Sequence, residues 1–350
     1  MSMALILLSI NVYQLTSDHT MRQSLISSWT LAISVAAIAT SMALPLAAQA
    51  QAWPKQPIKL VVTFPPGGSS DIVARALAPL LSEKLGQPIV IDNKPGAGAT
   101  IGAKFVADAA ADGYTLMLSN TAPISISPFM LDKQTYDPVK SFTHIYYIGA
   151  VPNVIAVLPS VPAKNMAEFT TWLKAQKEPV PFGSGGVGSI GHIVGEIYKN
   201  NTSTQLMHVP YKGSAPMHND LLGGTIKVAV DSLPQNIPFM KSGQLRLLAV
   251  TSKARMSNVP DIPTVIEAGY PQLVAENFLG LSAPASVPKE VVDSIHAAMS
   301  EIIKRPPVLQ KLEDLGIAHR PMSPAEFTGF VAAQVEAWAP AVKSSGAKLN

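Results

Sequence analysis

Short apolar runs alternate with amphipathic stretches along most of the chain. Residues 58–64 form a β-branched apolar run bounded by prolines, which predicts a buried strand. From Ile72 onward the apolar residues recur at helical spacing until Gly86, which predicts a helix that ends at that glycine. Two more strands are predicted at residues 89–91 and 114–118, with a second helix between them. This β-α-β-α-β order predicts a parallel sheet with helices on its faces.

A second set of predicted elements follows with different spacing. Strands are expected at residues 154–158, 180–182, 206–209, 226–230 and 245–250, and helices at residues 165–174 and 190–198. After Gly280 the chain is expected to be helical, and Ser323 and Glu326 form a capping box that begins the last helix. Two α/β lobes, joined by crossovers near residues 147–154 and 276–281, accommodate this order.

The N-terminal segment has the pattern of a secretory signal. Arg22 is followed by an apolar stretch over residues 25–46 and then by Ala48-Gln49-Ala50, which is a small-x-small cleavage pattern. A second pattern of this kind ends at Ala52. The length would also allow a transmembrane anchor, but several serines and the helix-breaking Pro45 weaken that interpretation. We therefore expect an exported protein whose leader is removed.

The predicted domain organisation follows from these patterns. Residues 1–50 form the leader, whose true start is expected at Met21. Residues 51–153 form the first lobe and residues 154–275 form the second lobe. Residues 276–350 cross back and place the C-terminal helices on the first lobe.

Composition narrows the classes of function. The chain has 350 residues, of which 47% are apolar and 14% charged, so a folded core is expected rather than disorder. Its 26 basic and 23 acidic residues are nearly balanced, which argues against nucleic-acid binding. The absence of cysteine excludes disulfides, thiolate nucleophiles and cysteine-based metal sites. The histidines lack metal-ligand spacing, and no paired catalytic groups can be identified. We expect no catalytic residues, no metal and no cofactor.

Two glycine-rich loops carry the candidate chemistry. Each follows a predicted strand and begins a predicted helix, where the first backbone N–H groups have no partner within the helix and the helix dipole is positive. Such a loop can bind an anion, and serine hydroxyls can add donors. The candidate residues are Pro66, Gly67, Gly68, Ser69, Ser70 and Asp71 in the first loop, and Ser184, Gly185, Gly186, Gly188 and Ser189 in the second. One loop from each lobe would hold a small anion between them, and two ordinary βα turns are the alternative.

Several other polar residues allow more than one role. Asp71 is expected to cap its helix, or else to face the cleft and hold a cationic group. Asp231 could bind a ligand amine or a lobe-closing hydroxyl, and capping in the core is the alternative. His192 and His208 are expected on a helix surface and at a strand end. The spacing Gly183-x-Gly185-x-x-Gly188 matches a dinucleotide-binding motif, but no acidic residue ends the next strand, so a nicotinamide cofactor is not expected.

Several short motifs occur in order from residue 53 to the C-terminus. They include Trp53-Pro54-Lys55-Gln56-Pro57, Phe64-Pro65-Pro66-Gly67-Gly68-Ser69-Ser70-Asp71, Asn93-Lys94-Pro95-Gly96-Ala97-Gly98, Asp112-Gly113-Tyr114-Thr115-Leu116, His208-Val209-Pro210-Tyr211-Lys212-Gly213 and Pro263-Thr264-Val265-Ile266-Glu267-Ala268-Gly269. Through these motifs the chain resembles the Bug-type extracytoplasmic solute receptors of tripartite tricarboxylate transporters.

This resemblance implies a fold, a ligand and a partner. The implied fold is a two-lobed periplasmic binding protein of type II, with a mainly parallel sheet flanked by helices in each lobe and a cleft between the lobes. The implied ligand is a small carboxylate held by the two glycine-rich loops, and the implied partners are the membrane components of the transporter. Asn120, Thr121 and Asp231 also fall where the family lines its cleft.

The protein is therefore expected to be a monomeric periplasmic receptor that is not an enzyme and does not bind nucleic acid. Two other functions remain open at this point. One is a sensor receptor that presents its ligand to a signalling partner, and the other is an exported enzyme that acts on a carboxylate.

Export with cleavage is the first testable prediction. Because the apolar stretch ends in two small-x-small patterns, we expect cleavage near Ala50 or Ala52, and N-terminal sequencing of the exported form should begin near Gln51 or Trp53. Recovery of an intact chain from the cytoplasm would contradict this prediction.

Overall fold

The computed structural model of the protein describes residues 53–349, and the expected leader lies outside them. The strands are β1 (Ile58–Val62), β2 (Ile89–Asn93), β3 (Thr115–Asn120), β4 (Phe142–Val157), β5 (Val180–Ser184), β6 (Leu206–Pro210), β7 (Val228–Ser232), β8 (Arg246–Val250) and β9 (Glu276–Pro284). The helices are α3 (Ser69–Leu85), α4 (Thr100–Ala107), α5 (Met166–Lys174), α6 (Ile190–Thr202), α7 (Ser214–Leu222), α8 (Leu233–Lys241), α9 (Lys289–Ile303), α10 (Pro306–Asp314) and α11 (Pro324–Ser345), with short turns η1 (Ala97–Ala99), η2 (Ala122–Ile126), η3 (Ser127–Phe129) and η4 (Pro271–Leu273).

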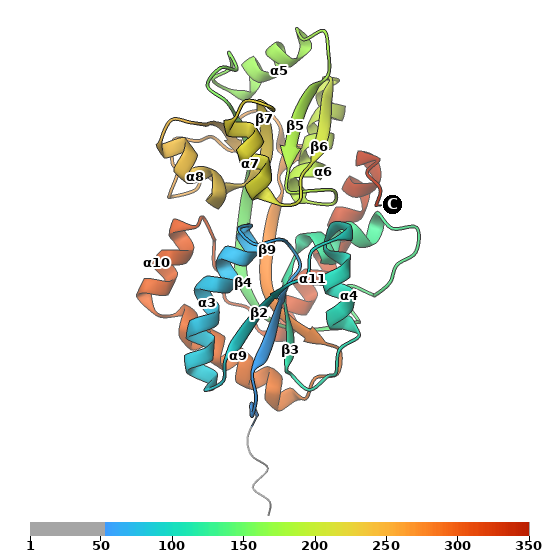
Figure 1. The fold of residues 1–350 in the computed structure, drawn as a ribbon, viewed down its shortest axis with the longest axis vertical. Coiled ribbons are helices and arrows are strands. Elements are labelled where there is room, and N and C mark those ends of the chain that lie inside the picture. Colours follow the sequence, from blue (N-terminus) through green and yellow to red (C-terminus); the bar gives the residue numbers. More distant parts are fainter. Residues whose placement is uncertain (1–52, 350) are drawn as a thin grey trace, which may run out of the picture. The chain divides into compact units, whose positions relative to one another are not determined.

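The strands form two groups that are joined through the long strand β4, which pairs with strands of both groups (Figure 1). In the first group β1 pairs in parallel with β2 and β3, and in the second group β5 pairs in parallel with β6 and β7. Strand β9 runs antiparallel to β3 and β4, and β4 runs antiparallel to β7 and β8. Each half of the fold therefore combines the expected parallel pairs with antiparallel pairs, which β9 and β4 make in the first half and β4 makes in the second. The mixed α/β fold predicted from the sequence is confirmed.

Strand β4 passes from one group to the other at a single point. Pro152 is the last residue that pairs with β9, opposite Glu276, and Asn153 is the first that pairs with β7. Thr251 holds this point together, because its hydroxyl accepts a hydrogen bond from the Asn153 amide at 2.8 Å and donates one to the Ala275 carbonyl at 2.5 Å. The two halves of the fold are thus joined by the continuous strand β4.

Helix α11 contributes to the cores of both halves. Phe327 and Val331 pack with residues of β1, β3 and β9 in one buried cluster. One end of the same helix places Trp338 and Val342 in a second buried cluster, with residues of α5, α6 and β5. The capping box predicted at the start of this helix is present, since Ser323 and Glu326 each accept a hydrogen bond from the other's backbone amide.

The expectation of helix directly after Gly280 is wrong. Residues up to Pro284 belong to β9, and α9 begins only at Lys289. Strand β4 also begins at Phe142, well before the strand predicted at residues 154–158. Glycine and proline inside these two strands obscured them, because such residues are typical of strand ends and turns. The division of the chain into lobes at particular residues stays a prediction.

Among residues 53–349, no helix has both the length and the apolar character that a membrane span requires.

Close packing fixes where α6 begins. Gly191 lies in its first turn, and a Cβ atom there would overlap the carbonyl oxygen of Val230 in β7. Glycine therefore lets the start of α6 approach the end of β7, which brings the residues after Gly185 next to Asp231.

We predict that Gly191→Ala destabilises the protein by about 1–3 kcal/mol, because the added methyl must displace the backbone of β7. Gly329→Ala is the matched control. Gly329 also lies in a helix, but a Cβ atom there would meet nothing within 4 Å, so this change should stabilise the protein by about 0.5–1 kcal/mol. Urea denaturation of both variants measures the difference, and equal stabilities would contradict the close-packing argument.

Candidate functional site

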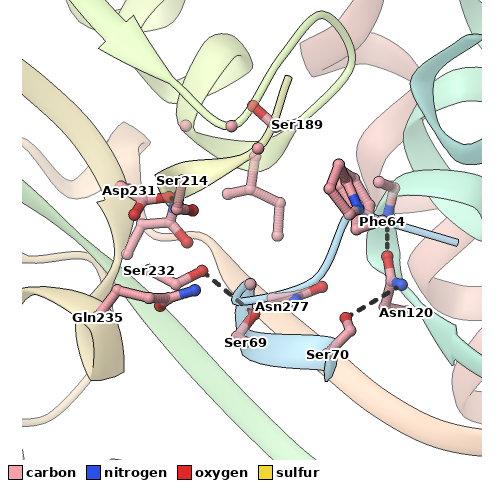
Figure 2. Close-up of a pocket in the computed structure, with 18 residues that line it drawn as sticks. Phe64, Ser69, Ser70, Asn120, Ser189, Ser214, Asp231, Ser232, Gln235 and Asn277 are labelled. Carbon is pink, nitrogen blue, oxygen red and sulfur yellow. Dashed lines mark hydrogen bonds between the residues drawn. The ribbon is translucent and has the colours of Figure 1, made fainter. Parts of the chain in front are cut away.

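A small cavity lies where loops from both halves of the fold meet (Figure 2). Its volume is about 60 Å³. Its lining residues are Phe64, Pro65, Gly68, Ser69, Ser70, Asn120, Ala122, Asn153, Gly185, Ser189, Ile190, Gly191, Gly213, Ser214, Asp231, Ser232, Gln235 and Asn277. No lysine or arginine belongs to this set.

The beginnings of four helices contribute to the cavity wall. The lining includes Ser69 of α3, Ile190 of α6 and Ser214 of α7, each the first residue of its helix, and Ser232, which directly precedes α8. The amides of a first helical turn have no carbonyl partner within the helix, and the helix dipole makes this end partly positive. The wall therefore presents neutral donors with partial positive charge, which suits an anion.

The first loop is held in place by Asp71. Its carboxylate accepts hydrogen bonds from the Gly67 amide at 2.9 Å, from Arg75 Nε at 2.8 Å and from Asn93 Nδ2 at 3.0 Å. Burial acts to raise the pKa of Asp71, but the hydrogen bonds from Arg75 and Gly67 outweigh it, so the pKa lies below its usual value. Asp71 therefore stabilises the loop and the start of α3, and it does not line the cavity.

The two halves of the fold contact each other across the cavity through Ser69. Its hydroxyl lies 3.4 Å from the Ser232 hydroxyl. With its amide oxygen turned toward α3, Gln235 accepts a hydrogen bond from the Ser69 amide at 2.6 Å and donates to the Ser232 carbonyl at 3.2 Å. Figure 2 shows these three residues together at one side of the cavity. Helices α3 and α8 are thereby joined at their first turns.

The second loop is supported by a buried serine and histidine network. Ser184 Oγ lies 2.7 Å from His208 Nε2 and is within 3.2 Å of the Gly186 amide, and Ser189 donates to Ser184 at 3.1 Å. The ring of His192 stacks on that of His208, with centroids 3.9 Å apart. The expectation that His192 lies on a helix surface is wrong: it is buried, because its ring packs against that of His208 in β6.

Asn120 and Thr121 act at the end of β3. Asn120 Nδ2 donates to Ser70 Oγ at 3.4 Å, so the two lining side chains position each other. Thr121 faces β9 instead, where its amide donates to Asn277 Oδ1 at 3.2 Å and its hydroxyl donates to the Glu276 carbonyl at 3.2 Å. Thr121 thereby fixes Asn277, which does line the cavity.

Asp231 is the acidic residue of the cavity wall, with 5% of its surface exposed. Its Oδ1 accepts a hydrogen bond from Ser214 Oγ at 2.9 Å, and its Oδ2 lies 3.9 Å from His218 Nε2. Burial raises the pKa of Asp231, and His218 and the Ser214 hydroxyl act against that rise.

The structure brings part of the predicted set together. The predicted residues that line the cavity are Gly68, Ser69, Ser70, Asn120, Gly185, Ser189 and Asp231. Those outside the lining are Pro66, Gly67, Asp71, Thr121, Ser184, Gly186 and Gly188. Lining residues that the sequence did not indicate are Phe64, Pro65, Ala122, Asn153, Ile190, Gly191, Gly213, Ser214, Ser232, Gln235 and Asn277. Gly213 could have indicated a third loop of the site, since it directly precedes a helix just as Gly68 does.

A larger cavity of about 620 Å³ adjoins the small one, and both share Phe64, Pro65, Gly185 and Gly213. Lys212 and Lys348 lie on the larger wall. The basic side chains are thus placed beside the small cavity and not within it, where they can attract an anion from solution. Within residues 53–349 no group of three or more His, Asp or Glu side chains could hold a metal ion.

Known proteins resemble this chain in sequence and fold over most of its length. The sequence model of the tripartite tricarboxylate transporter family receptor matches residues 73–347. Protein BugT of Bordetella pertussis is 33% identical over 302 residues, which cover 86% of this chain and 93% of BugT. A structure from R. palustris solved with adipate is 33% identical, with a TM-score of 0.81 over 85% of this chain and 99% of that chain. MatC from Rhodopseudomonas palustris, solved with bound malate, is 28% identical, with a TM-score of 0.78 over 83% of this chain and 100% of that chain.

The fold and the cavity define a solute-binding protein of the periplasmic type. The chain belongs to the receptor family of the tripartite tricarboxylate transporters, as its motifs suggested.

The histidine pair predicts acid sensitivity. Burial lowers the pKa of His208 to about 3 and that of His192 to about 4, whereas an unfolded chain protonates histidine near 6.5. Between these values the unfolded state binds more protons, so the free energy of unfolding should fall as the pH falls from 6.5 toward 4. In His208→Gln one of the two histidines no longer titrates. We therefore expect the free energy of unfolding to fall less steeply with pH in this variant, by up to about 1.4 kcal/mol per pH unit.

Urea denaturation of the parent and the variant across this pH range measures the effect. The comparison at pH 8, where the buried histidines are neutral in both states, gives the cost of the substitution alone. Identical pH dependence in the two proteins would contradict the assignment.

Proposed function

We propose that this protein is an exported receptor that binds a small carboxylate in the 60 Å³ cavity and delivers it to the membrane components of a tripartite tricarboxylate transporter. The observation that carries the proposal is the set of helix beginnings around a cavity lined by no lysine or arginine. Hydrogen bonds from neutral N–H groups to a charged acceptor are stronger than those to a neutral acceptor, so a carboxylate can bind without a full positive charge nearby.

The relatives support this ligand class. The R. palustris structure was solved with adipate and MatC with malate, and both ligands are carboxylates. A carboxylate in this chain would lie between the first turns of α3 and α6, which come from the two halves of the fold. Separation of these halves, by bending where β4 passes from β9 to β7, would let the ligand enter and leave.

A role in binding also accounts for the buried Ser184–His208 contact. Such a pair would activate a serine nucleophile if it faced the substrate. Ser184 is fully buried and does not line the cavity, and its hydroxyl is bonded to the second loop. We therefore assign this pair to holding the loop, and we expect the ligand to be released unchanged by a monomeric receptor.

Calorimetry of a bound carboxylate against its amide or methyl ester tests the ligand class. The carboxylate should bind at least tenfold more tightly, since each charge-assisted hydrogen bond that is lost costs about 1.5–3 kcal/mol. Equal affinity for the neutral analogue would contradict the proposal.

A matched pair of variants tests the helix amides themselves. Ile190 is the first residue of α6, and the extended backbone of Ser189 before it can accept a following proline. We expect Ile190→Pro, which lacks the N–H, to weaken carboxylate binding about tenfold or more relative to Ile190→Ala, which loses the side chain and keeps the N–H. Equal binding by the two variants would show that this amide does not contact the ligand.

A further inference from the structure

A separate cavity of about 630 Å³ lies on the other face of β9 from the small cavity. Asn277 lines the small cavity, whereas its two neighbours in β9, Glu276 and Phe278, line this one. Successive side chains of a strand point to opposite faces of the sheet, so β9 separates the two cavities. We call the cavity that Glu276 and Phe278 line, together with residues of α6 and α11, the rear cavity. Its volume lies within the range of roughly 300–1,000 Å³ that is typical of small-molecule sites.

The rear cavity has an aromatic wall that elements distant in the sequence build together. Tyr147 of β4, Phe278 of β9 and Phe330 of α11 all line it. The ring of Phe330 makes T-shaped contacts with the other two rings, with centroids 5.2 Å from Tyr147 and 5.6 Å from Phe278. Ile197 of α6 and Trp338 of α11 extend this wall. A large apolar side chain, and an aromatic ring above all, packs well against such a surface.

Three charged side chains line the same cavity: Glu276, Lys253 and Arg320. Within residues 53–349 the side chains of these three form neither an ion pair nor a hydrogen bond. Glu276 is half-buried, and burial raises the pKa of its carboxyl group while Lys253 acts against that rise. The cavity therefore holds a carboxylate without a donor and two cations without an acceptor.

We infer that the rear cavity is a second binding site, and that its ligand is an α-amino acid with a large apolar side chain. The ammonium group of this ligand donates to Glu276, and its carboxylate accepts from Arg320 and Lys253. Its side chain packs on the aromatic wall. The inference does not depend on which solute binds in the small cavity.

A ligand with a single charge satisfies only part of this cavity. A simple amine would pair with Glu276 but would be repelled by Lys253 and Arg320. A simple carboxylate would pair with the cations and leave Glu276 without a donor. The cavity of about 620 Å³ beside the small one differs in this respect, because it is lined by lysines and by no acidic side chain.

Calorimetry at neutral pH with three matched ligands tests the inference. Phenylalanine carries both charges, hydrocinnamate lacks the ammonium group, and phenethylamine lacks the carboxylate. We expect phenylalanine to bind at least about tenfold more tightly than either of the others, because each of them loses charge-assisted hydrogen bonds. Equal affinity for phenylalanine and hydrocinnamate, or no binding of phenylalanine, would overturn the inference.

Variants of the charged side chains locate the ligand. Glu276→Gln should remove the advantage of phenylalanine over hydrocinnamate, and binding of hydrocinnamate to this variant shows that the cavity is still folded. The double variant Lys253→Gln with Arg320→Gln should remove the advantage of phenylalanine over phenethylamine. Glu336→Gln is the matched control, because Glu336 is an exposed residue of α11 outside the cavity lining, so the affinities should not change.

Ile190→Pro separates this site from the small cavity, because Ile190 lines the small cavity and not the rear one. Phenylalanine binding that persists in Ile190→Pro and weakens in the double variant supports the inference. The reverse pattern would place the amino acid in the small cavity, and it would overturn the inference while leaving the proposed carboxylate receptor intact. Phenylalanine binding of the expected pattern in a protein that binds no other carboxylate would support this site and contradict the proposed function.

Discussion

The first-turn amides of α-helices cannot be satisfied inside their own helices, and the site depends on where these amides point. In this protein the chain begins α3, α6, α7 and α8 around one small cavity. Glycine at Gly213, just before α7, and at Gly191, within the first turn of α6, permits the close approach that this convergence requires. In the proposed function, anion affinity comes from these backbone dipoles, and the side chains chiefly hold the dipoles in place.

Positioning these dipoles requires rigid support behind each loop. Under the first loop the support is ionic, since Asp71 joins Gly67, Arg75 and Asn93. Under the second loop the support is neutral, since Ser184 is hydrogen-bonded to His208, whose ring stacks on that of His192. The two supports respond differently to pH, because the pKa of the aspartate lies below its usual value while protonation of either histidine would place a charge in a buried site.

The sequence predicts correctly those helices and strands that leave a local pattern of residues. The strands before the two glycine-rich loops, the helices after them and the last helix with its capping box all follow from periodicity and turn residues. The long strands β4 and β9 were missed in large part, because their length depends on pairing with strands that are distant in the sequence. Asn153, Gln235 and Asn277 were missed for the same reason: each is an ordinary polar residue locally, and only the tertiary fold brings it to the cavity. Asp231 was found because it ends an apolar strand.

The place of Asn153 has a consequence for how a ligand is captured. Asn153 lies where β4 leaves β9 and joins β7, beside the Thr251 bonds that hold this point together. When two bodies rotate about a common axis, an atom is displaced in proportion to its lever arm. If the two halves separate by bending at this crossing, as proposed, an axis through it would give Asn153 almost no lever arm. Asn153 would then keep its place in the cavity wall while the helix starts at Ser69 and Ile190 move apart.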